Sequence, residues 1–269
     1  MTSAPVSVLV NAPPTVALTS PADGATFTAP ADVTVTASAS DTDGAVGKVE
    51  FYQGATKIGE DTTAPYQVTW TGVAAGVYNL TARATDDRGA ATATPPVSIT
   101  VIANLAPTAD AYVRDSAWAG TNFGSATTLQ VRVASGSGDR WTYVRFDTTG
   151  VATVRQARLR LFGALSATTS ATVMASTFPV ANTTWGEATI TWNNKPATGG
   201  TALSTVTLVN NSTVPQWYEW DVTAYLQQEK AAGRHVVTLA VRNNASSSPF
   251  DMFNSREAAS NRPVLQITP

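Results

Sequence analysis

Residues 141–163 read WTYVRFDTTGVATVRQARLRLFG, and their pattern indicates two β-strands joined by a turn. Apolar and polar side chains alternate in residues 141–147 and again in residues 157–163. This period of two is typical of a strand that presents one face to a core. The intervening Gly150 supplies a residue that turns commonly contain. The stretch therefore favours an antiparallel β-fold.

Similar alternating runs extend over almost the whole chain. They occupy residues 15–19, 33–39, 47–53, 66–70, 77–84 and 97–102, and then 110–114, 128–134, 171–177, 204–209, 216–223, 235–243, 251–255 and 263–269. Turn clusters such as DTDG and DDRG separate them. Ala224–Ala232 has a helical pattern, with Thr223 placed to cap the helix and Gly233 to end it. The sequence predicts an all-β fold with one helix.

The length of 269 residues favours two domains, each large enough for its own core. The proline-containing segments VNAPPT, residues 10–15, and ANLAPT, residues 103–108, are similar and are typical of linkers before a β-module. We therefore expect a linker at residues 1–13 and an immunoglobulin-like sandwich at 14–103. A larger β-sandwich of about ten strands should follow at 104–269, with a jelly roll as its expected topology.

Composition excludes several kinds of site. The chain has no cysteine and one histidine, His235, so disulfides, thiolate metal sites and multi-histidine metal sites are ruled out. No apolar run approaches the length that crosses a bilayer.

Residues 1–103 carry four basic against nine acidic residues, a charge of −5. Residues 104–269 carry 13 against 10, a charge of +3, together with six of the seven tryptophans.

This distribution of charge and tryptophan suits an acidic ligand that contains rings. A strand-rich core would also use many tryptophans, so an ordinary structural origin stays open. A charge of +3 is too small to indicate nucleic-acid binding. We therefore expect neither a nucleic-acid partner nor a membrane.

The first part of the chain resembles a known family. Residues 39–70, ASDTDGAVGKVEFYQGATKIGEDTTAPYQVTW, and residues 78–90, YNLTARATDDRGA, are similar to the bacterial immunoglobulin-like spacer modules of extracellular enzymes and adhesins. The KVEFY strand, the TAPY turn and the ATDxxGA ending occur in the order of that family. The resemblance implies a spacer domain.

The second part resembles the DNRLRE-type module, also described as carbohydrate-binding module family 96. The motifs that carry this resemblance are ADAYVRDSAWAGTNFGSATTLQVR, WTYVRFDTTG, ARLRLF, TTWGEATITWNNKPA, WDVTAYL and FNSREAASNRPVLQI, in that order. The resemblance implies a non-catalytic β-sandwich of a secreted polysaccharide-degrading enzyme, with alginate as the best-known ligand. It also implies a monomer tethered to a lyase or hydrolase domain. The N-terminus MTSAPVSVLV does not look like a signal peptide, so the expected secreted or cell-surface location rests on this resemblance.

Strand parity suggests which residues contact the ligand. If the apolar residues of three candidate strands face the core, five side chains face outward: Arg132, Arg145, Arg160, Trp141 and Tyr143. Guanidinium groups pair with carboxylates and aromatic rings stack on sugars, so these residues would suit a polyuronate. Outward arginines also serve solubility and protect strand edges, which is the competing interpretation.

Two further residues are candidates for carbohydrate binding. Trp118 lies in the loop SAWAGTNFG and is interpreted as an exposed platform, with a loop-closing plug as the alternative. Arg256 occupies a motif position in FNSREA, where it could contact ligand or pair with Glu257. A large hydrophobic side chain is usually buried, so the other motif tryptophans are expected in the core. These are Trp185, Trp192 and Trp220.

Metal sites receive weaker support. Asp41-x-Asp43-Gly44 begins like a calcium loop but lacks its distal glutamate, so a simple turn is expected there, as at Asp86 and Asp87. In the second part, Asp110, Asp115 and Asp139 are candidate oxygen ligands of a structural Ca²⁺. No cofactor is otherwise required.

No catalytic motif of the common hydrolase, nucleotide or metalloprotease types occurs, and His235 is more typical of a helix terminus or surface. The sequence therefore predicts a non-catalytic region that binds an acidic polysaccharide, with alginate as the expected ligand. A structural or adhesion stalk without a glycan ligand is the first alternative, and a free-standing lyase or hydrolase is the second.

Overall fold

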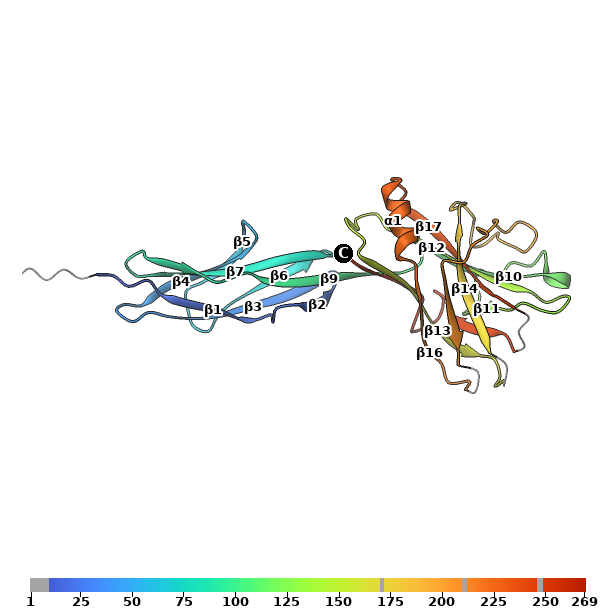
Figure 1. The fold of residues 1–269 in the computed structure, drawn as a ribbon, viewed down its shortest axis with the longest axis horizontal. Helices are drawn as coiled ribbons and strands as arrows, with labels where there is room; N and C mark the ends of the chain where they lie inside the picture. The colour runs from blue at the N-terminus through green and yellow to red at the C-terminus, as the bar shows by residue number, and fades with distance from the viewer. Residues whose placement is uncertain (1–9, 170–171, 210–211, 246–248) are drawn as a thin grey trace, which may run out of the picture. The chain divides into compact units, whose positions relative to one another are not determined.

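The computed structural model describes residues 10–169, 172–209, 212–245 and 249–269, and it is all-β except for one α-helix and one short 3-10 helix in these ranges (Figure 1). The chain divides into two compact units, Met1–Ile102 and Ala103–Pro269. The division lies one residue before the boundary expected from the sequence. The predicted fold class, two successive β-sandwiches of which the second is larger, is confirmed.

The first unit contains two sheets. One has the order β1-β3-β6, from Thr15–Ser20, Ala31–Ser40 and Tyr66–Val73. The other has the order β9-β7-β4-β5, from Val97–Leu105, Gly76–Asp86, Val46–Gln53 and Thr56–Asp61. Two short strands join it, β2 (Ala25–Thr28) parallel to β9 and β8 (Ala91–Ala93) beside β7. The core includes Val35, Phe51, Leu80 and Ile99, which are fully buried.

The acidic turns of the first unit use their carboxylates to hold backbone. Asp41 Oδ1 accepts the amide of Asp43, and Asp43 pairs with Arg88 at 3.1 Å. Asp86 Oδ1 accepts the amides of Arg88 and Ala90, both at 2.9 Å. These contacts are those of strand-connecting turns, as the sequence indicated.

The second unit also has two layers. One is a five-stranded sheet in the order β10-β12-β17-β14-β15, from Ala109–Arg114, Arg140–Asp147, Val236–Asn243, Val173–Val180 and Ser204–Leu208. In the other layer, β13 (Gln156–Leu165) pairs with β16 (Gln216–Asp221) on one side and with β18 (Asp251–Asn254) and β19 (Val264–Thr268) on the other. Strand β11 (Thr128–Val131) pairs with β18, and the last residues of β9 pair with β19.

Large apolar side chains fill the space between these layers. Phe146, Leu161 and Phe253 are at most 1% exposed. Trp220 is fully buried on β16, and its Nε1 donates to the carbonyl of Ala175 on β14 at 2.8 Å. This hydrogen bond links the two sheets, and the predicted core position of Trp220 is confirmed.

A long segment covers the outer face of the five-stranded sheet. Residues 181–203, which we call the covering loop, connect β14 to β15. Its Trp185 and Ile190 pack against Ala111, Tyr143 and Ala240 of the sheet. The part of the five-stranded sheet formed by β10, β12 and β17 is therefore covered on both faces.

The prediction that Tyr143 faces solvent is wrong. Its side chain is fully buried, and its hydroxyl donates to the carbonyl of Pro196 at 2.9 Å. The side chain does lie on the face opposite the inner core, but the covering loop occupies that face. Alternation identifies which residues share a face and does not show what lies on that face.

Helix α1, Thr223–Ala231, follows β16. Val222 occupies the N-cap, so Thr223 is the first helical residue and not the cap that the sequence suggested. The Thr223 hydroxyl instead accepts the amide of Ala157 at 2.9 Å. Gly233 has a φ of +71°, in the left-handed region that ends helices. Within the described ranges, no helix combines the length and apolar character needed to traverse a bilayer.

Candidate functional site

Three arginines lie side by side at one end of the second unit. The register of β10 and β12 pairs Arg114 with Arg140, and an isolated bridge pairs Arg140 with Arg132. Paired residues of antiparallel neighbours project from the same face of a sheet. Burial and the nearby charges of Arg114 and Arg132 lower the pKa of Arg140. Arg140 is 8% exposed and donates to Gln130 Oε1 at 2.8 Å, so an anion would meet Arg114 and Arg132, while Arg140 contributes through its charge.

An exposed tryptophan adjoins the arginine row. Trp118 ends the 3-10 helix Ser116–Trp118 and is 45% exposed. The guanidinium carbon of Arg114 lies 5.2 Å from its ring centroid, and the ring of Phe123 lies at 6.2 Å. The ring is thus supported from within and open to solvent, as the platform interpretation requires.

A second group of cations and tryptophans starts at the next residue of β12. The Lys195 ammonium lies 3.6 Å from the ring centroid of Trp192 and 5.0 Å from that of Trp141. The Arg242 guanidinium carbon lies 4.3 Å from the Trp141 ring. A cavity of about 410 Å³ opens here, lined by Trp141 and by Lys195, Pro196, Ala197 and Thr198 of the covering loop.

We call these two groups together the cationic end. It comprises Arg114, Arg132, Arg140, Lys195 and Arg242 with Trp118, Trp141 and Trp192. Arg140 and Trp141 are consecutive residues of β12, so the two groups lie at the same end of this strand, on opposite faces of the sheet. Burial lowers the pKa of Lys195 against the attraction of Asp115 and Asp139.

Asp115 and Asp139 hold the backbone of this region. Asp115 Oδ1 accepts the amide of Gly138 at 2.6 Å, and Asp139 Oδ1 accepts the amide of Ala134 at 2.8 Å. Asp110 lies elsewhere, because the length of β10, about 17 Å, separates it from Asp115. The three candidate calcium ligands of the sequence analysis, Asp110, Asp115 and Asp139, therefore do not form one cluster.

Three of the predicted binding arginines contact protein groups away from the cationic end. Arg145 Nη1 donates to the carbonyls of Trp185 at 2.7 Å and Thr183 at 3.2 Å. Arg160 lies in the other sheet, where it pairs with Glu219 at 2.9 Å. The contacts of Arg256 are described below. The expectation that Arg132, Arg145 and Arg160 share one surface with Trp141 and Tyr143 is therefore wrong, because β12 and β13 belong to different sheets.

The outer face of the β13–β16 pair carries another mixed group. The Arg160 guanidinium carbon lies 4.8 Å from the Trp217 ring, and Phe162 packs on the same ring at 5.4 Å. Arg158 and Arg160 both pair with Glu219, at 2.7 and 2.9 Å. Because Glu219 offsets part of this positive charge, the face is less suited to an anionic polymer than the cationic end is.

The other sequence candidates have clear positions. Trp185 is 7% exposed, and its Nε1 donates to Thr238 Oγ1 at 3.2 Å, which confirms its core position. Trp192 packs partly buried against the same core. The sequence analysis did not single out Arg114, Arg140, Lys195 or Arg242. These residues lie at strand ends or in the covering loop, where the alternation of side chains along a strand does not indicate which way a side chain points.

A two-layered β-sandwich with tryptophans beside clustered cations has the architecture of a non-catalytic carbohydrate-binding module. The model of carbohydrate-binding module family 96 matches residues 101–269, so the chain belongs to this family. The model of a bacterial Ig domain matches residues 14–82. The arrangement expected from the sequence is confirmed, and modules of both kinds are non-catalytic.

The chain is similar to several characterised proteins. Gellan lyase of Bacillus sp. is 30% identical over 166 residues, which cover 61% of this chain and 6% of that protein. The chain thus spans a small part of this relative. The fibronectin(III)-like modules of Clostridium thermocellum CbhA share 40% identity over 32% of this chain and 94% of theirs, with a TM-score of 0.31. A carbohydrate-binding module of the β-sandwich superfamily shares 11% identity over 96% of this chain and 98% of its own, with a TM-score of 0.35.

Proposed function

We propose that the second unit binds an acidic polysaccharide through the cationic end and thereby holds a tethered catalytic domain on its polymer. The observation that supports this most is the row of Arg114, Arg140 and Arg132, flanked by Trp118 on one side and by the Trp141–Lys195 group on the other. The chain belongs to a carbohydrate-binding family, so the proposal concerns the ligand and its site.

The chemistry of the cationic end favours a polymer with repeated carboxylates. Guanidinium groups form two parallel hydrogen bonds with a carboxylate, and an indole ring stacks on the apolar face of a sugar. Each exposed ion pair contributes less than about 1 kcal/mol, so one carboxylate would be held weakly. A polyuronate engages several cations at once, and its affinity rises through multivalency.

The proposal retains part of the set of residues inferred from the sequence. Arg132, Trp118 and Trp141 belong to the cationic end, whereas Tyr143 is buried and Arg145, Arg160 and Arg256 contact other protein groups. We propose alginate as the polymer to test first. The relative named gellan lyase supports a parent that degrades a polysaccharide, and we propose that this parent acts outside the cell. We further propose that the parent is a lyase or a hydrolase and that this chain acts as a monomer.

Affinity electrophoresis and titration calorimetry with alginate and a neutral glucan test the proposal. We expect binding to alginate at low salt and a steep fall in affinity toward about 0.5 M NaCl, where the Debye length is only a few ångströms. The neutral glucan should bind much more weakly. Equal affinity for the two polymers would contradict an electrostatic site.

Variants locate the site. Arg114→Ala and Lys195→Ala should each weaken alginate binding by about two- to tenfold. Lys230→Ala and Arg155→Ala are matched controls, because Lys230 donates to the carbonyl of Val151, beyond the opposite end of β12 from Arg140. Equal losses in the variants and the controls would show a diffuse charge effect and contradict the assignment. Binding to no glycan in a panel would favour the stalk alternative.

A further inference from the structure

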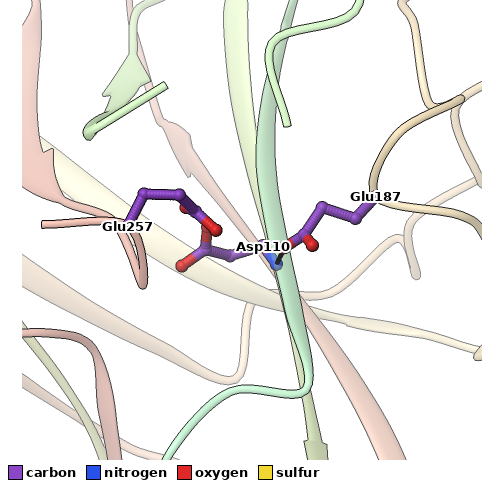
Figure 2. A group of neighbouring side chains, drawn as sticks. All are labelled: Asp110, Glu187 and Glu257. Carbon is purple, nitrogen blue, oxygen red and sulfur yellow. Dashed lines mark hydrogen bonds between the residues drawn. The ribbon is translucent and has the colours of Figure 1, made fainter. Parts of the chain in front are cut away.

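A second polar cluster lies apart from the cationic end, at the other end of β10. Carboxylate oxygens of Asp110, Glu187 and Glu257 all lie within 4.8 Å of one another. Figure 2 shows the carboxyl groups of Asp110 and Glu257 turned toward each other, with the Glu187 side chain reaching Asp110 from another side. The three residues come from β10, from the covering loop and from the turn after β18.

Neighbouring contacts fix the position of Glu187. Asn122 Nδ2 donates to the carbonyls of Glu187 at 2.8 Å and Ile190 at 2.7 Å. A Cβ atom on Gly124 would lie 2.0 Å from the Glu187 carbonyl oxygen, so the loop fits closely against a residue without a side chain. Glu187 Oε1 then accepts the amide of Asp110 at 2.7 Å. These contacts hold the Glu187 carboxylate in a defined position.

Two oxygens of the cluster are buried without a hydrogen-bond partner among the described residues. Asp110 is 1% exposed, and although its Oδ2 accepts the amide of Arg256 at 2.8 Å, its Oδ1 accepts nothing. Glu257 Oε2 is buried and unpartnered in the same way. Leaving buried carboxylate oxygens unsatisfied is costly, so these two oxygens are placed to hold a cation or a further hydrogen-bond donor.

The charges of the cluster do not balance. Arg256 Nη1 pairs with Glu187 Oε2 at 3.0 Å, and its Nε lies 3.7 Å from Glu257 Oε1. Three ionised carboxylates and one guanidinium leave a net charge of −2. A bound divalent cation would match this charge.

The cluster also has access and suitable chemistry. A cavity of about 330 Å³ adjoins it, lined by Asn122, Gly124, Ser125, Glu187, Ala188 and Glu257. The donors are carboxylate oxygens, which hard cations prefer, and the cavity has room for water ligands. Calcium accepts six to eight oxygens in flexible geometry, whereas magnesium requires a near-ideal octahedron. Calcium therefore fits an irregular set of three carboxylates better.

We propose that Asp110, Glu187 and Glu257 bind a structural calcium ion, with Arg256 as the neighbouring ion-pair partner of both glutamates. The ion would join the first strand of the second unit, the covering loop and the segment before β19. The three residues are far apart in the sequence, so an ion bound to all of them would close long loops of the chain. These loops open on unfolding, and the bound ion would therefore stabilise the folded state. The competing explanation is that Arg256 and a protonated Asp110 satisfy the cluster without metal.

Thermal unfolding of the full chain, first treated with chelator, tests the proposal. We expect about 5 mM CaCl₂ to raise the melting temperature of the second unit by about 2–8 °C, and MgCl₂ at the same concentration to raise it less. Titration calorimetry of the same protein should detect binding of calcium. Absence of both a calcium-dependent shift and binding heat would overturn the proposal, as would an equal or larger effect of MgCl₂.

Isosteric variants locate the ion. Glu257→Gln and Asp110→Asn remove a charge with little change in shape, and both should abolish the calcium-dependent shift while circular dichroism shows an unchanged fold. Asp139→Asn is the matched control, because Asp139 accepts the amide of Ala134 at the cationic end and should leave the shift intact. Should Asp110→Asn fail to fold, Glu257→Gln decides alone, since its side chain is only partly buried. A shift that persists in Glu257→Gln would overturn the assignment.

Discussion

Arg145 shows how one side chain can secure a long loop. Its guanidinium donates to the carbonyls of Thr183 and Trp185 and to the hydroxyl of Thr108. Removal of the guanidinium leaves these acceptors with fewer donors, and hydrogen bonds to charged groups are worth about 1.5–3 kcal/mol. Arg145, which the sequence suggested as a ligand contact, therefore holds the covering loop in place.

We expect Arg145→Ala to lower the melting temperature of the second unit by about 4–8 °C, which corresponds to about 2 kcal/mol. Arg145→Lys should restore little, because an ammonium group does not reproduce the planar fork. Differential scanning calorimetry measures both changes. An unchanged melting temperature combined with a tenfold loss of alginate affinity would return Arg145 to the ligand site.

Gly124 is a second residue whose identity the structure explains. A Cβ at this position would lie 2.0 Å from the carbonyl oxygen and 2.7 Å from the carbonyl carbon of Glu187. We expect Gly124→Ala to destabilise the second unit by about 1–3 kcal/mol, because backbone must move to make room. Ser125→Ala, at an exposed neighbouring position, is the control and should change stability by less than about 0.5 kcal/mol. Urea unfolding of both variants compares them, and similar midpoints would contradict this account.

At the scale of elements, an ion-pair group around one buried carboxylate joins three strands of the first unit. Glu50 on β4 is 7% exposed, and its Oε1 accepts Lys57 at 2.8 Å and Lys48 at 3.1 Å, while Arg83 of β7 lies 3.9 Å from Oε2. Hydrogen bonds from Lys57 and then Lys48 outweigh burial and lower the pKa of Glu50 to about 2. This pKa lies below the unfolded-state value of 4.5. The ionised Glu50 carboxylate therefore stabilises the folded first unit fully at pH values above 4.5.

The first unit should therefore lose stability as the pH falls from 4.5 toward 2. Because Lys48 and Lys57 are about 40% exposed, solvent screening limits the contribution to about 1–2 kcal/mol. Glu50→Gln should lower the stability at pH 7 and flatten its decline between pH 7 and pH 2.5. Calorimetric melting across this range measures the slope, and a variant with the parental slope would contradict the assignment.

The elements themselves could be predicted far better than their partners. Each of the ten strands expected after residue 103 is present, because period-two alternation and turn residues are local signals. The short strands β2, β5 and β8 of the first unit were missed, since three to six residues give little periodicity. Which strands form a sheet depends on contacts between distant segments. Arg145 and Arg160 were consequently placed on one surface although their strands lie in different sheets.

The covering loop explains the error at Tyr143. The outer face of the five-stranded sheet carries Ala109, Ala111 and Ala240, whose small side chains leave room for Trp185 and Ile190. These alanines were a signal that both faces are buried, which alternation at Trp141–Asp147 concealed. The carboxylate cluster was equally hidden, because Asp110 and Glu187 are 77 residues apart and meet only through the fold.

At the scale of the whole molecule, the two units differ in charge. All residues of the cationic end belong to the second unit, and residues 1–103 carry a charge of −5. We expect a chain of residues 101–269 to bind its polysaccharide with affinity within about threefold of the full chain. Residues 103–105 must be kept because they pair with β19. A loss beyond about tenfold, or 1.4 kcal/mol, would contradict the role of the first unit as a spacer.

The two halves of the covering loop make different contacts. Trp185, Glu187 and Ile190 fasten its first half to the sheet and to Asn122, whereas Trp192 and Lys195 lie in its second half at the cationic end. The hydroxyl of Tyr143 holds this second half through a backbone carbonyl, that of Pro196, so the contact does not depend on side-chain identity. The side chains of residues 191–198 can therefore vary without loss of this contact. We expect an exchange of these side chains to change which polymer the second unit binds while the sandwich beneath them stays folded.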